Sequence, residues 1–355
     1  MMKKLSQNNL LFVGRNWSTM SANNTFANLL KFFPKSINVT SKDLTGFDNR
    51  FYRYLKNKTG NSCYSSLSVA LEINVIKKSI GNDIKIIHYW FGDHDYYYGF
   101  LFKKILGSKI IINLFFSLEE LERRMPNKFH LKSADLITCS GKAQIDYLST
   151  FIDRNKLAYL PLGIDTNYFS PLSGKINRDK NLVICVGNNR RDYKTLENIY
   201  LILKEKNPNI QLKLAGSLKG KDKFLNYPEV EILPFLSEEE FKDLYNRASI
   251  LILPLLEGGS SQTLNEALSS GLPVITNSFP NLSDYINTSA VLSFPPKDFK
   301  SMAQACLDLL DDEKRINLMS KNARAHMLNY DNSIIKKKLT IIYEDYLGFK
   351  ICESG

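Results

Sequence analysis

The sequence predicts an α/β protein built from two doubly wound, Rossmann-like parallel-sheet domains that face each other across a cleft. Apolar, β-branched runs alternate with helical patterns along all 355 residues, as in βαβ units. The strand candidates are continuously apolar, which is typical of parallel strands covered on both faces. The length exceeds the size at which one hydrophobic core stops growing, so we expect two domains.

The first half of the chain alternates strand and helix patterns as far as residue 160. Its basic N-terminus precedes an apolar stretch that is too short for a signal peptide and that we interpret as the first strand. We expect strands at Leu10–Val13, Ile84–His88, Lys109–Asn113, Leu136–Cys139 and Ala158–Leu160, and helices at Tyr64–Lys78, Tyr97–Leu106 and Gly141–Phe151.

A domain boundary is predicted where the turn-rich segment Gly163–Pro171 leads into the polar segment Leu172–Lys180. We therefore expect an N-terminal domain over residues 1–168, a C-terminal domain over 169–330, and a helix in 331–355 that packs across the domain junction. In the second half we expect strands at Leu182–Val186, Gln211–Ala215, Val230–Leu233, Ile250–Leu253, Pro273–Thr276 and Ala290–Leu292, and helices at Lys194–Lys206, Ser237–Ala248, Gln262–Ser270 and Lys300–Leu310.

The net charge of +11 predicts a polyanionic neighbour, such as a phosphate-bearing substrate, an anionic lipid surface or nucleic acid. Small lysine clusters stand at Lys77-Lys78, Lys103-Lys104 and Lys336–Lys338, and most of these lysines are interpreted as solvated surface. The charge is diffuse, and no nucleic-acid-binding motif accompanies it, so we expect no nucleic-acid partner. No apolar run is long enough for a transmembrane helix.

The cysteines argue against a zinc site and a disulfide framework. Five of them are scattered along the chain without a C-x-x-C pair: Cys63, Cys139, Cys185, Cys306 and Cys352. Cys139 and Cys185 lie in apolar runs and are expected to be core thiols. This pattern fits a reducing cytoplasm.

The loop that follows the predicted strand Ile250–Leu253 carries the strongest signal for a ligand. It opens a helix whose first turns carry Glu266. Free backbone N–H groups and the positive end of a helix dipole bind phosphate, and an ionised carboxylate accepts hydrogen bonds from two neighbouring sugar hydroxyls. The loop therefore favours a sugar nucleotide over a plain helix cap. Its binding candidates are Gly258, Gly259, Ser260, Ser261, Gln262 and Thr263.

A second candidate follows the predicted strand Leu182–Val186, where Gly187 is followed by Arg190, Arg191 and Lys194. Arginine binds phosphate with two parallel hydrogen bonds, and lysine adds a point charge. Ligands of such sheets bind at the carboxyl ends of the strands, so we interpret these cations as phosphate-binding. The alternative is solvated loop charge.

Two segments of the first half are candidates for contact with a second substrate. Gly14 follows the first strand and lets a ligand approach the backbone, whereas the absence of G-x-G-x-x-G counts against a nicotinamide dehydrogenase. After the strand that ends near His88, the segment Tyr89–Asp95 offers aromatic rings that can stack on sugars, and His94 as an acid, a base or an acceptor-binding group. The spacing of His88 and His94 is not diagnostic of a metal site.

The chain resembles the retaining, two-domain glycosyltransferases of the GT-B fold, family GT4 or glycosyltransferase group 1. Leu182–Gly187 with Arg191 and Lys194 is similar to the phosphate-clamping Gly…Arg…Lys loop of that family. The stretch from Glu257 through Glu266 to Gly271-Leu-Pro is similar to its E-x7-E region. Here eight residues separate the two glutamates, so either the loop has one extra residue or the first carboxylate is absent. Ala134–Ser140 and Leu160–Pro171 are similar to the end of the family's first domain.

The resemblance implies transfer of a sugar, of the hexosyltransferase type, from a nucleotide-diphosphate donor to a glycan or lipid-linked glycan, with retention and without metal or cofactor. Arg190, Arg191, Lys194 and the N–H groups of Ser261–Thr263 would stabilise the leaving diphosphate, each donor being worth about 3 kcal/mol. By the same resemblance, Glu266 would bind the ribose and Glu257 would approach the sugar. The family's histidine has no counterpart in Ile110–Ser117, so His88 or His94 would stand in for it. The acceptor would bind the first domain around Gly14–Trp17 and Tyr89–Asp95.

The resemblance also implies a role in surface polysaccharide biosynthesis in the cytoplasm, with peripheral contact to an anionic membrane through the lysines of 336–338. Two alternatives share the same phosphate site. One is a non-hydrolysing nucleotide-sugar epimerase, which needs no acceptor. The other is a catalytically inactive sugar-nucleotide-binding subunit, which the irregular glutamate spacing suggests.

Overall fold

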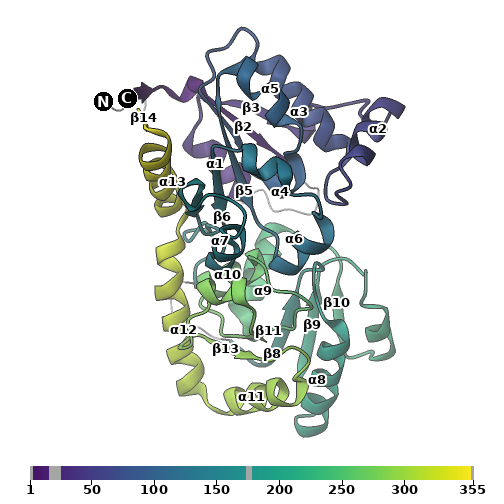
Figure 1. The fold of residues 1–355 in the computed structure, drawn as a ribbon. Helices are drawn as coiled ribbons and strands as arrows, with labels where there is room; N and C mark the ends of the chain where they lie inside the picture. The colour runs from purple at the N-terminus through teal and green to yellow at the C-terminus, as the bar shows by residue number, and fades with distance from the viewer. Residues whose placement is uncertain (1–2, 16–24, 173–177, 353–355) are drawn as a thin grey trace. The chain divides into compact units, whose positions relative to one another are not determined.

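The computed structural model describes residues 3–15, 25–172 and 178–352. The chain divides into two compact units (Figure 1). Unit 1 consists of residues 1–162 and 332–355, and unit 2 consists of residues 163–331. Each unit contains one six-stranded sheet in which every pair of neighbouring strands is parallel.

Unit 1 is a parallel sheet in the order β3-β2-β4-β5-β6-β7 with helices around it. Successive residues of β2 point to opposite faces: Leu11 and Val13 enter one core, and Leu10 and Phe12 enter the other. Because both faces are buried, the strands are apolar throughout. The strands are β2 (Leu10–Gly14), β3 (Ile37–Thr40), β4 (Ile86–Tyr89), β5 (Lys109–Leu114), β6 (Leu136–Cys139) and β7 (Leu157–Tyr159).

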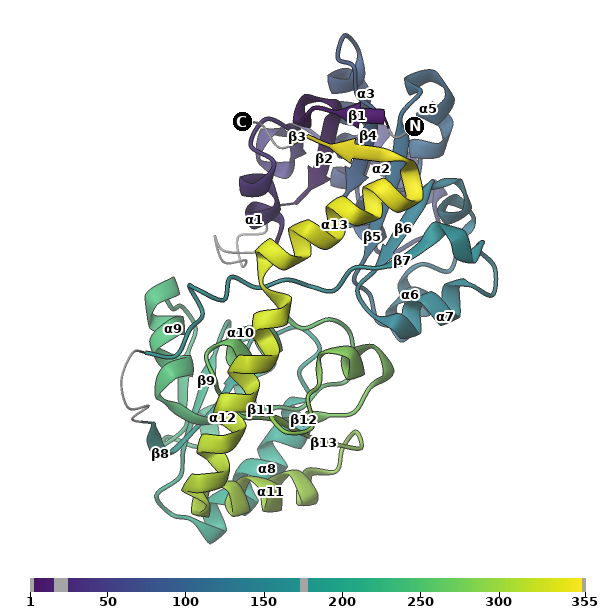
Figure 2. The same ribbon diagram turned by 90° about the vertical axis from the view of Figure 1, so that its left-hand side faces the viewer.

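The helices of unit 1 include α13, which the chain forms after it returns from unit 2. Leu339 and Tyr343 of α13 are fully buried in the core that contains Leu10 and Phe12, and Figure 2 shows the helix in yellow over this sheet. The helices are α1 (Thr25–Phe32), α2 (Arg50–Lys58), α3 (Ser66–Ser79), α4 (Gly92–Asp95), α5 (Gly99–Leu106), α6 (Leu118–Arg124), α7 (Lys142–Leu148) and α13 (Asn332–Leu347).

A two-stranded parallel ribbon joins the beginning of the chain to its end. β1 (Lys3–Leu5) pairs with β14 (Phe349–Ile351) over three residues, with Lys3 opposite Phe349 and Leu5 opposite Ile351. Leu5 and Ile351 are buried against the core beneath α13. Both β1 and β14 are therefore anchored to the core of unit 1.

Unit 2 repeats the doubly wound plan in the order β10-β9-β8-β11-β12-β13. Its core includes Val183, Ile250 and Ile275 from three adjacent strands. The strands are β8 (Asp179–Val186), β9 (Gln211–Ala215), β10 (Glu231–Leu233), β11 (Ala248–Leu253), β12 (Val274–Asn277) and β13 (Val291–Phe294), and the helices are α8 (Tyr193–Lys206), α9 (Glu238–Arg247), α10 (Gln262–Ser269), α11 (Phe299–Asp311) and α12 (Glu313–Met327).

The structure confirms the α/β class, the two parallel sheets and all of the predicted strands to within three residues at each end. It adds elements that the sequence analysis did not predict, among them β1, β3, β14, α1, α2, α4 and α12. Cys139 and Cys185 are buried strand residues, as expected. In the described ranges of the chain, no helix combines the length and apolar character needed to span a membrane.

The division between the units falls at Leu162–Gly163, whereas the predicted boundary is at 168–169. The segment after Leu162 already bonds to unit 2: the Ile164 N–H donates to the Tyr330 carbonyl at 3.0 Å, and the Arg324 guanidinium donates to the Thr166 carbonyl at 2.7 Å. The C-terminal helix was expected to pack across the domain junction. It is grouped with unit 1, because its apolar side belongs to the core of that unit.

Candidate functional site

The best candidate site of unit 2 lies at the point where the strand order of its sheet reverses. The chain proceeds outward from β8 to β9 and β10, then returns to place β11 on the other side of β8. Ligands of such sheets bind outside the carboxyl ends of the strands at this reversal. Two loops meet there: the Asp192 N–H donates to the Pro254 carbonyl at 2.9 Å, and the Leu256 N–H donates to the Arg190 carbonyl at 2.8 Å.

Arg191 ties the loop after β8 to the beginning of α10. Its guanidinium donates to the carbonyls of Val186 and Asn189, each at 2.8 Å, and to the Thr263 hydroxyl at 3.0 Å. These acceptors are neutral, and among the described residues no carboxylate lies within ion-pair distance of Arg191. The site therefore holds a fixed positive charge that the protein does not neutralise.

Gly187 is required by this arrangement. Its φ of +88° lies in the left-handed region, and a Cβ there would stand 2.7 Å from the terminal nitrogen of Arg191. The Tyr193 hydroxyl donates to the Gly187 carbonyl at 2.8 Å. Any other residue at this position would displace the guanidinium.

Helix α10 begins beside the Arg191 guanidinium, which donates to Thr263 in the first turn of the helix. Glu266 lies one turn further along α10. Ser261 caps the helix, because its hydroxyl accepts the Leu264 N–H at 3.3 Å. The first N–H groups of a helix have no partner within the helix, and here they lie beside the residue that Arg191 holds. The sequence motif and the structure thus agree on the N-terminus of α10.

Glu266 is held in place by the buried Tyr245 of α9, whose hydroxyl donates to Oε2 at 2.8 Å. Burial raises the pKa of Glu266 to about 7, although the Tyr245 hydrogen bond and the charge of Arg191 both act to lower it. The charge of the Arg191 guanidinium therefore affects the ionisation of the Glu266 carboxylate. The carboxylate oxygens of Glu266 are suited to accept hydrogen bonds from two adjacent hydroxyls.

Two predicted cations are placed differently from Arg191. Lys194 is 69% exposed and pairs with Glu197 of its own helix, Nζ to Oε2 being 3.1 Å, so the structure does not bring it to the guanidinium of Arg191. Arg190 is half-buried with a φ of 62°, and its carbonyl takes part in the pairing of the two loops.

The loop Glu257–Ser260 explains the unusual spacing of the two glutamates. With seven residues in between, the position that pairs with Glu266 is Gly258, where a Cβ would stand 1.9 Å from the Cβ of Phe279. Phe279 therefore occupies the space that a side chain at 258 would need. Glu257 is half-buried one residue earlier, Gly259 is buried, and Ser260 is half-buried.

Lys221 is a residue of this region that the sequence analysis did not single out. It follows β9, is 1% exposed, and donates through Nζ to the Gly216 carbonyl at 2.7 Å. A lysine in a Lys-rich stretch gives no sequence signal, because its burial depends on how the loop after β9 folds back. A glycine at a strand end, here Gly216, is the one local hint.

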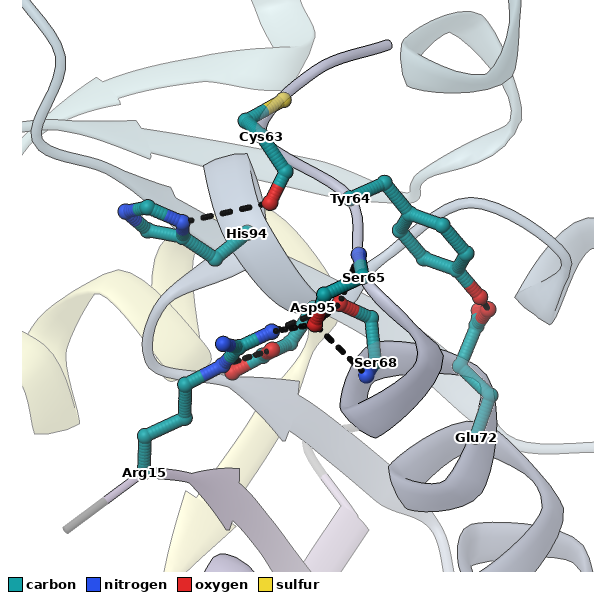
Figure 3. Close-up of polar contacts among 8 residues, drawn as sticks. All are labelled: Arg15, Cys63, Tyr64, Ser65, Ser68, Glu72, His94 and Asp95. Carbon is teal, nitrogen blue, oxygen red and sulfur yellow. Dashed lines mark hydrogen bonds and ion pairs between the residues drawn. The ribbon is translucent and has the colours of Figure 1, made fainter. Parts of the chain in front are cut away.

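In unit 1 the strand order reverses between β2 and β4, and Arg15 lies there at the end of β2 (Figure 3). Its Nε donates to Asp95 Oδ1 at 2.5 Å, and its Nη2 donates to the hydroxyls of Ser68 at 2.6 Å and Ser65 at 3.1 Å. Asp95 neutralises this guanidinium, unlike that of Arg191. Arg15, Ser68 and Asp95 are buried, so the cluster is a polar network inside unit 1 without a net positive charge.

The predicted residues Gly14 and His88 have packing roles in the structure. A Cβ on Gly14 would stand 2.5 Å from the ring of Phe26. His88 is buried between the Tyr343 hydroxyl at 2.7 Å from Nδ1 and the Asn113 side-chain oxygen at 2.9 Å from Nε2. Burial lowers the pKa of His88 to about 4, so the ring is neutral at pH 7.

His94 is half-buried on the short helix α4, near the Arg15 cluster (Figure 3). Its Nδ1 lies 3.4 Å from the Cys63 carbonyl oxygen, and its ring meets Phe116 edge-on at 4.8 Å. A carbonyl only accepts, so Nδ1 carries the proton and Nε2 is the basic nitrogen. Of the neighbouring acceptor candidates, Tyr89 and Asp93 are buried, and Trp17 lies outside the described residues.

Glu72 fixes the chain beside this cluster (Figure 3). Its carboxylate accepts the backbone N–H groups of Tyr97, Tyr98 and Gly99 at 3.1, 3.0 and 2.6 Å, and also the hydroxyl of Tyr64. Burial raises the pKa of Glu72 to about 7. Through these contacts Glu72 stabilises the start of α5.

Within the described ranges, no group of three or more His, Cys, Asp or Glu is arranged to hold a metal ion.

Comparison with known proteins shows what this chain is similar to. Residues 171–326 match the family described as "Glycosyl transferases group 1". A curated relative, MMP alpha-(1->4)-mannosyltransferase of Mycolicibacterium hassiacum, is 23% identical over 229 residues, which cover 61% of this chain and 54% of the relative. The match thus spans about half the length of that relative.

Two solved structures are similar over nearly the whole chain. The glycosyltransferase from Rickettsia africae is 16% identical, covers 97% of this chain and 99% of its own, and gives a TM-score of 0.69. HepE of Anabaena, solved with UDP-glucose, is 14% identical, covers 97% of this chain and 100% of its own, and gives a TM-score of 0.67.

The two sheets and these similarities define a protein of the GT-B class, as the sequence predicts. Unit 2 carries the segment that is similar to the group 1 glycosyl transferases.

Proposed function

We propose that the protein transfers a sugar from a nucleoside diphosphate sugar to a glycan or lipid-linked glycan, with retention of the anomeric configuration. The observation that carries the proposal is the unneutralised guanidinium of Arg191, bonded to Thr263 at the start of α10. A diphosphate fits this combination of a fixed cation and a helix N-terminus. The name of the mannosyltransferase relative and the UDP-glucose bound to HepE support the same donor class.

In the proposed reaction the bond between the anomeric carbon and the diphosphate oxygen breaks, and an acceptor hydroxyl oxygen bonds to that carbon from the same face. The hydroxyl proton leaves with the nucleoside diphosphate. Arg191 and the first N–H groups of α10 stabilise the charge that grows on the leaving oxygen. Glu266 accepts hydrogen bonds from the two ribose hydroxyls. No step of this reaction needs a metal ion.

The acceptor is proposed to bind unit 1 near α4. His94 is half-buried there, and the half-buried Ser65 lies at the edge of the Arg15 cluster. A neutral, hydrogen-bonding surface suits glycan hydroxyls. His94 then orients the acceptor hydroxyl.

A peripheral contact with an anionic membrane is also proposed, through α2 rather than through the lysines of 336–338. The first residue of that lysine cluster, Lys336, lies on α13 with its Nζ 5.7 Å from the centre of the Phe32 ring. By contrast, α2 has no buried residue, exposes Phe51 and Tyr54, and contains four basic and no acidic residues. Aromatic rings with basic neighbours bind the surface of anionic bilayers. Such a contact would bring a lipid-linked acceptor to the enzyme in the cytoplasm.

The test of the donor site is the thermal shift of the protein with UDP, GDP, ADP and CMP in the absence of metal. A ligand of the folded state raises the midpoint by mass action. We expect one nucleoside diphosphate to raise it, and Glu266→Ala to abolish the shift. No shift with any of the four would overturn the proposal.

The same purified protein separates transfer from its alternatives. A nucleotide-sugar epimerase would interconvert the donor alone, whereas a transferase consumes it only with an acceptor. An inactive subunit would bind the donor without consuming it under either condition. Product analysis by mass spectrometry and proton NMR, with and without a mixture of glycan acceptors, distinguishes the three.

A further inference from the structure

Lys221 is a buried ammonium group at the carboxyl edge of the unit 2 sheet. It belongs to the short 3-10 helix Asp222–Asn226 as its first flanking residue and is 1% exposed. The neighbouring strands β8 and β9 end beside it, and the Gly187 N–H donates to the Ala215 carbonyl at 3.0 Å. Lys221 therefore belongs to the same strand edge as the loop that holds Arg191.

The ammonium group is incompletely bonded. Three N–H groups are available, and within the described chain the Gly216 carbonyl is the one hydrogen-bond acceptor of Nζ. Gly216 has a φ of +109°, and a Cβ there would lie 3.3 Å from Lys221 Nζ and 2.9 Å from Asn188 Oδ1. Asn188 Oδ1 is itself buried and has no hydrogen-bond partner in the described part of the chain. Two unsatisfied polar groups thus meet around one glycine.

The groups that face Lys221 from the elements around it supply no negative charge. They are the buried thiol of Cys185 from β8, the guanidinium of Arg191, and the ring of Tyr193 from α8, whose centre is 6.0 Å from Nζ. The nearby Lys223 points elsewhere and pairs with Glu197 at 3.5 Å. A buried cation without a carboxylate is costly unless a ligand supplies the anion.

We propose that Lys221 is a second cation of the diphosphate site and donates to a phosphate oxygen of the bound nucleotide sugar. It takes the role that the sequence predicted for Lys194. The proposal rests on the proposed function, because it names a further ligand-binding residue of that same site. Asn188 orients the ammonium group once the ligand is bound, which satisfies both unpaired groups.

The direct test compares Lys221→Gln with the matched control Lys223→Gln, a neighbouring lysine with an exposed side chain and an ion pair. Glutamine keeps an N–H donor for the Gly216 carbonyl and removes the charge. The probes are the nucleoside diphosphate with the largest thermal shift and its parent nucleoside, measured by calorimetry. We expect Lys221→Gln to weaken diphosphate binding at least tenfold and to leave the nucleoside unchanged, and Lys223→Gln to change neither.

The outcomes separate this inference from the function on which it rests. If the wild-type protein binds no nucleoside diphosphate, the proposed function fails. If the wild-type protein binds one and Lys221→Gln binds it equally well, Lys221 is a structural residue and the inference fails. Lys221→Arg, which restores a cation, is expected to recover most of the affinity.

A pH series on the wild-type protein tests the same point if the Gln variant does not fold. Burial lowers the pKa of Lys221 to about 8, so the ammonium loses its proton as the pH rises from 7 to 9. The terminal phosphate of the ligand is already ionised over this range. Glu266, with a pKa of about 7, also ionises in this range and contacts the ribose of both ligands. We therefore expect diphosphate affinity to fall relative to nucleoside affinity across it. An unchanged ratio of the two affinities would contradict the inference.

Discussion

Arg191 shows how a single residue can be a scaffold and a binding group at once. Its guanidinium donates hydrogen bonds to two carbonyls and one hydroxyl. These neutral acceptors fix its position without forming an ion pair. A preorganised cation of this kind needs no rearrangement when negative charge develops beside it. The residue is consequently sensitive to shape as well as to charge.

We expect Arg191→Met to reduce kcat for sugar transfer by about 100-fold, the cost of removing one preorganised donor. Arg191→Lys should recover little, because an ammonium group cannot reach all three acceptors. Steady-state kinetics with the donor identified by thermal shift measures both. The control is Lys204→Met on the exposed side of α8, and equal losses in the control and in Arg191→Met would refute a specific role.

Gly258 gives a second prediction at the scale of one residue. A Cβ at this position would stand 1.9 Å from Phe279, so Gly258→Ala should lower the free energy of unfolding by about 1–3 kcal/mol through overpacking. Shortening the opposing side chain in Gly258→Ala/Phe279→Ala should restore part of the loss, because the two sites are coupled. Urea unfolding of the two single variants and the double variant tests this, and additive losses would contradict the packing account.

His88 links two elements, β4 and α13, and makes that link sensitive to pH. Its folded pKa of about 4 lies below the usual 6.5, so its contribution to stability is present at neutral pH and is lost as the pH falls from 6.5 to 4. The loss amounts to about 3 kcal/mol over that window. We expect the stability advantage of the wild type over His88→Asn to shrink by this amount.

Urea unfolding of the wild type and of His88→Asn at pH 7 and pH 4.5 measures that advantage. The difference between the two proteins is required, because the raised pKa values of Glu72 and Asp93 act in the opposite direction. A difference that stays constant with pH would show that His88 is not buried as a neutral ring.

Helix α2 is the element on which membrane contact is predicted to depend. We expect the variant Phe51→Ser/Tyr54→Ser to reduce binding to vesicles with anionic lipid at least tenfold, and Arg50→Glu/Arg53→Glu to abolish its salt dependence. Sedimentation with phosphatidylcholine and phosphatidylglycerol vesicles measures binding. Lys337→Glu/Lys338→Glu on α13 is the matched control, and a larger effect there would restore the interpretation drawn from the sequence.

The strands that the sequence predicts are those formed by mostly apolar runs, because both faces of the sheet are buried there. The central strands are such runs, whereas β3 at the sheet edge is half-buried at Ile37 and Asn38 and therefore lacks the pattern. The short strands β1 and β14 exist only because the chain ends pair. Local motifs also located Arg191, Thr263 and Glu266, but they could not distinguish the buried Lys221 from the exposed Lys194, because side-chain direction depends on the fold around it.

At the scale of the whole molecule, unit 2 is continuous in sequence and unit 1 is not. Both ends of unit 2 are tied together by the pairing of Ile164 with Asp331. We expect a fragment of residues 163–331 to fold alone and to bind the nucleoside diphosphate within threefold of the intact chain. Calorimetry and two-dimensional NMR test this, and an unfolded fragment would show that unit 2 needs unit 1.

Unit 1, by contrast, is expected not to survive the loss of residues 332–355. Leu339 and Tyr343 are fully buried in its core, so their removal would expose the sheet face that contains Leu10 and Phe12. We expect residues 1–331 to aggregate or to form a molten state. Light scattering and circular dichroism would detect these outcomes. A cooperative unfolding transition with wild-type stability would contradict it.

The pairing of β1 with β14 means that the order of the chain can be rewritten without altering its three-dimensional contacts. Because the two strands are parallel, a crossover linker of about a dozen residues from the end of β14 to the start of β1 is needed. With new ends opened between Asp331 and Asn332, it would yield a circular permutant in which unit 1 is one unbroken segment. Unit 2 would then follow it as a separate cassette joined by a single connection. Donor-binding cassettes of related enzymes could be exchanged on that connection without disturbing the core beneath α13.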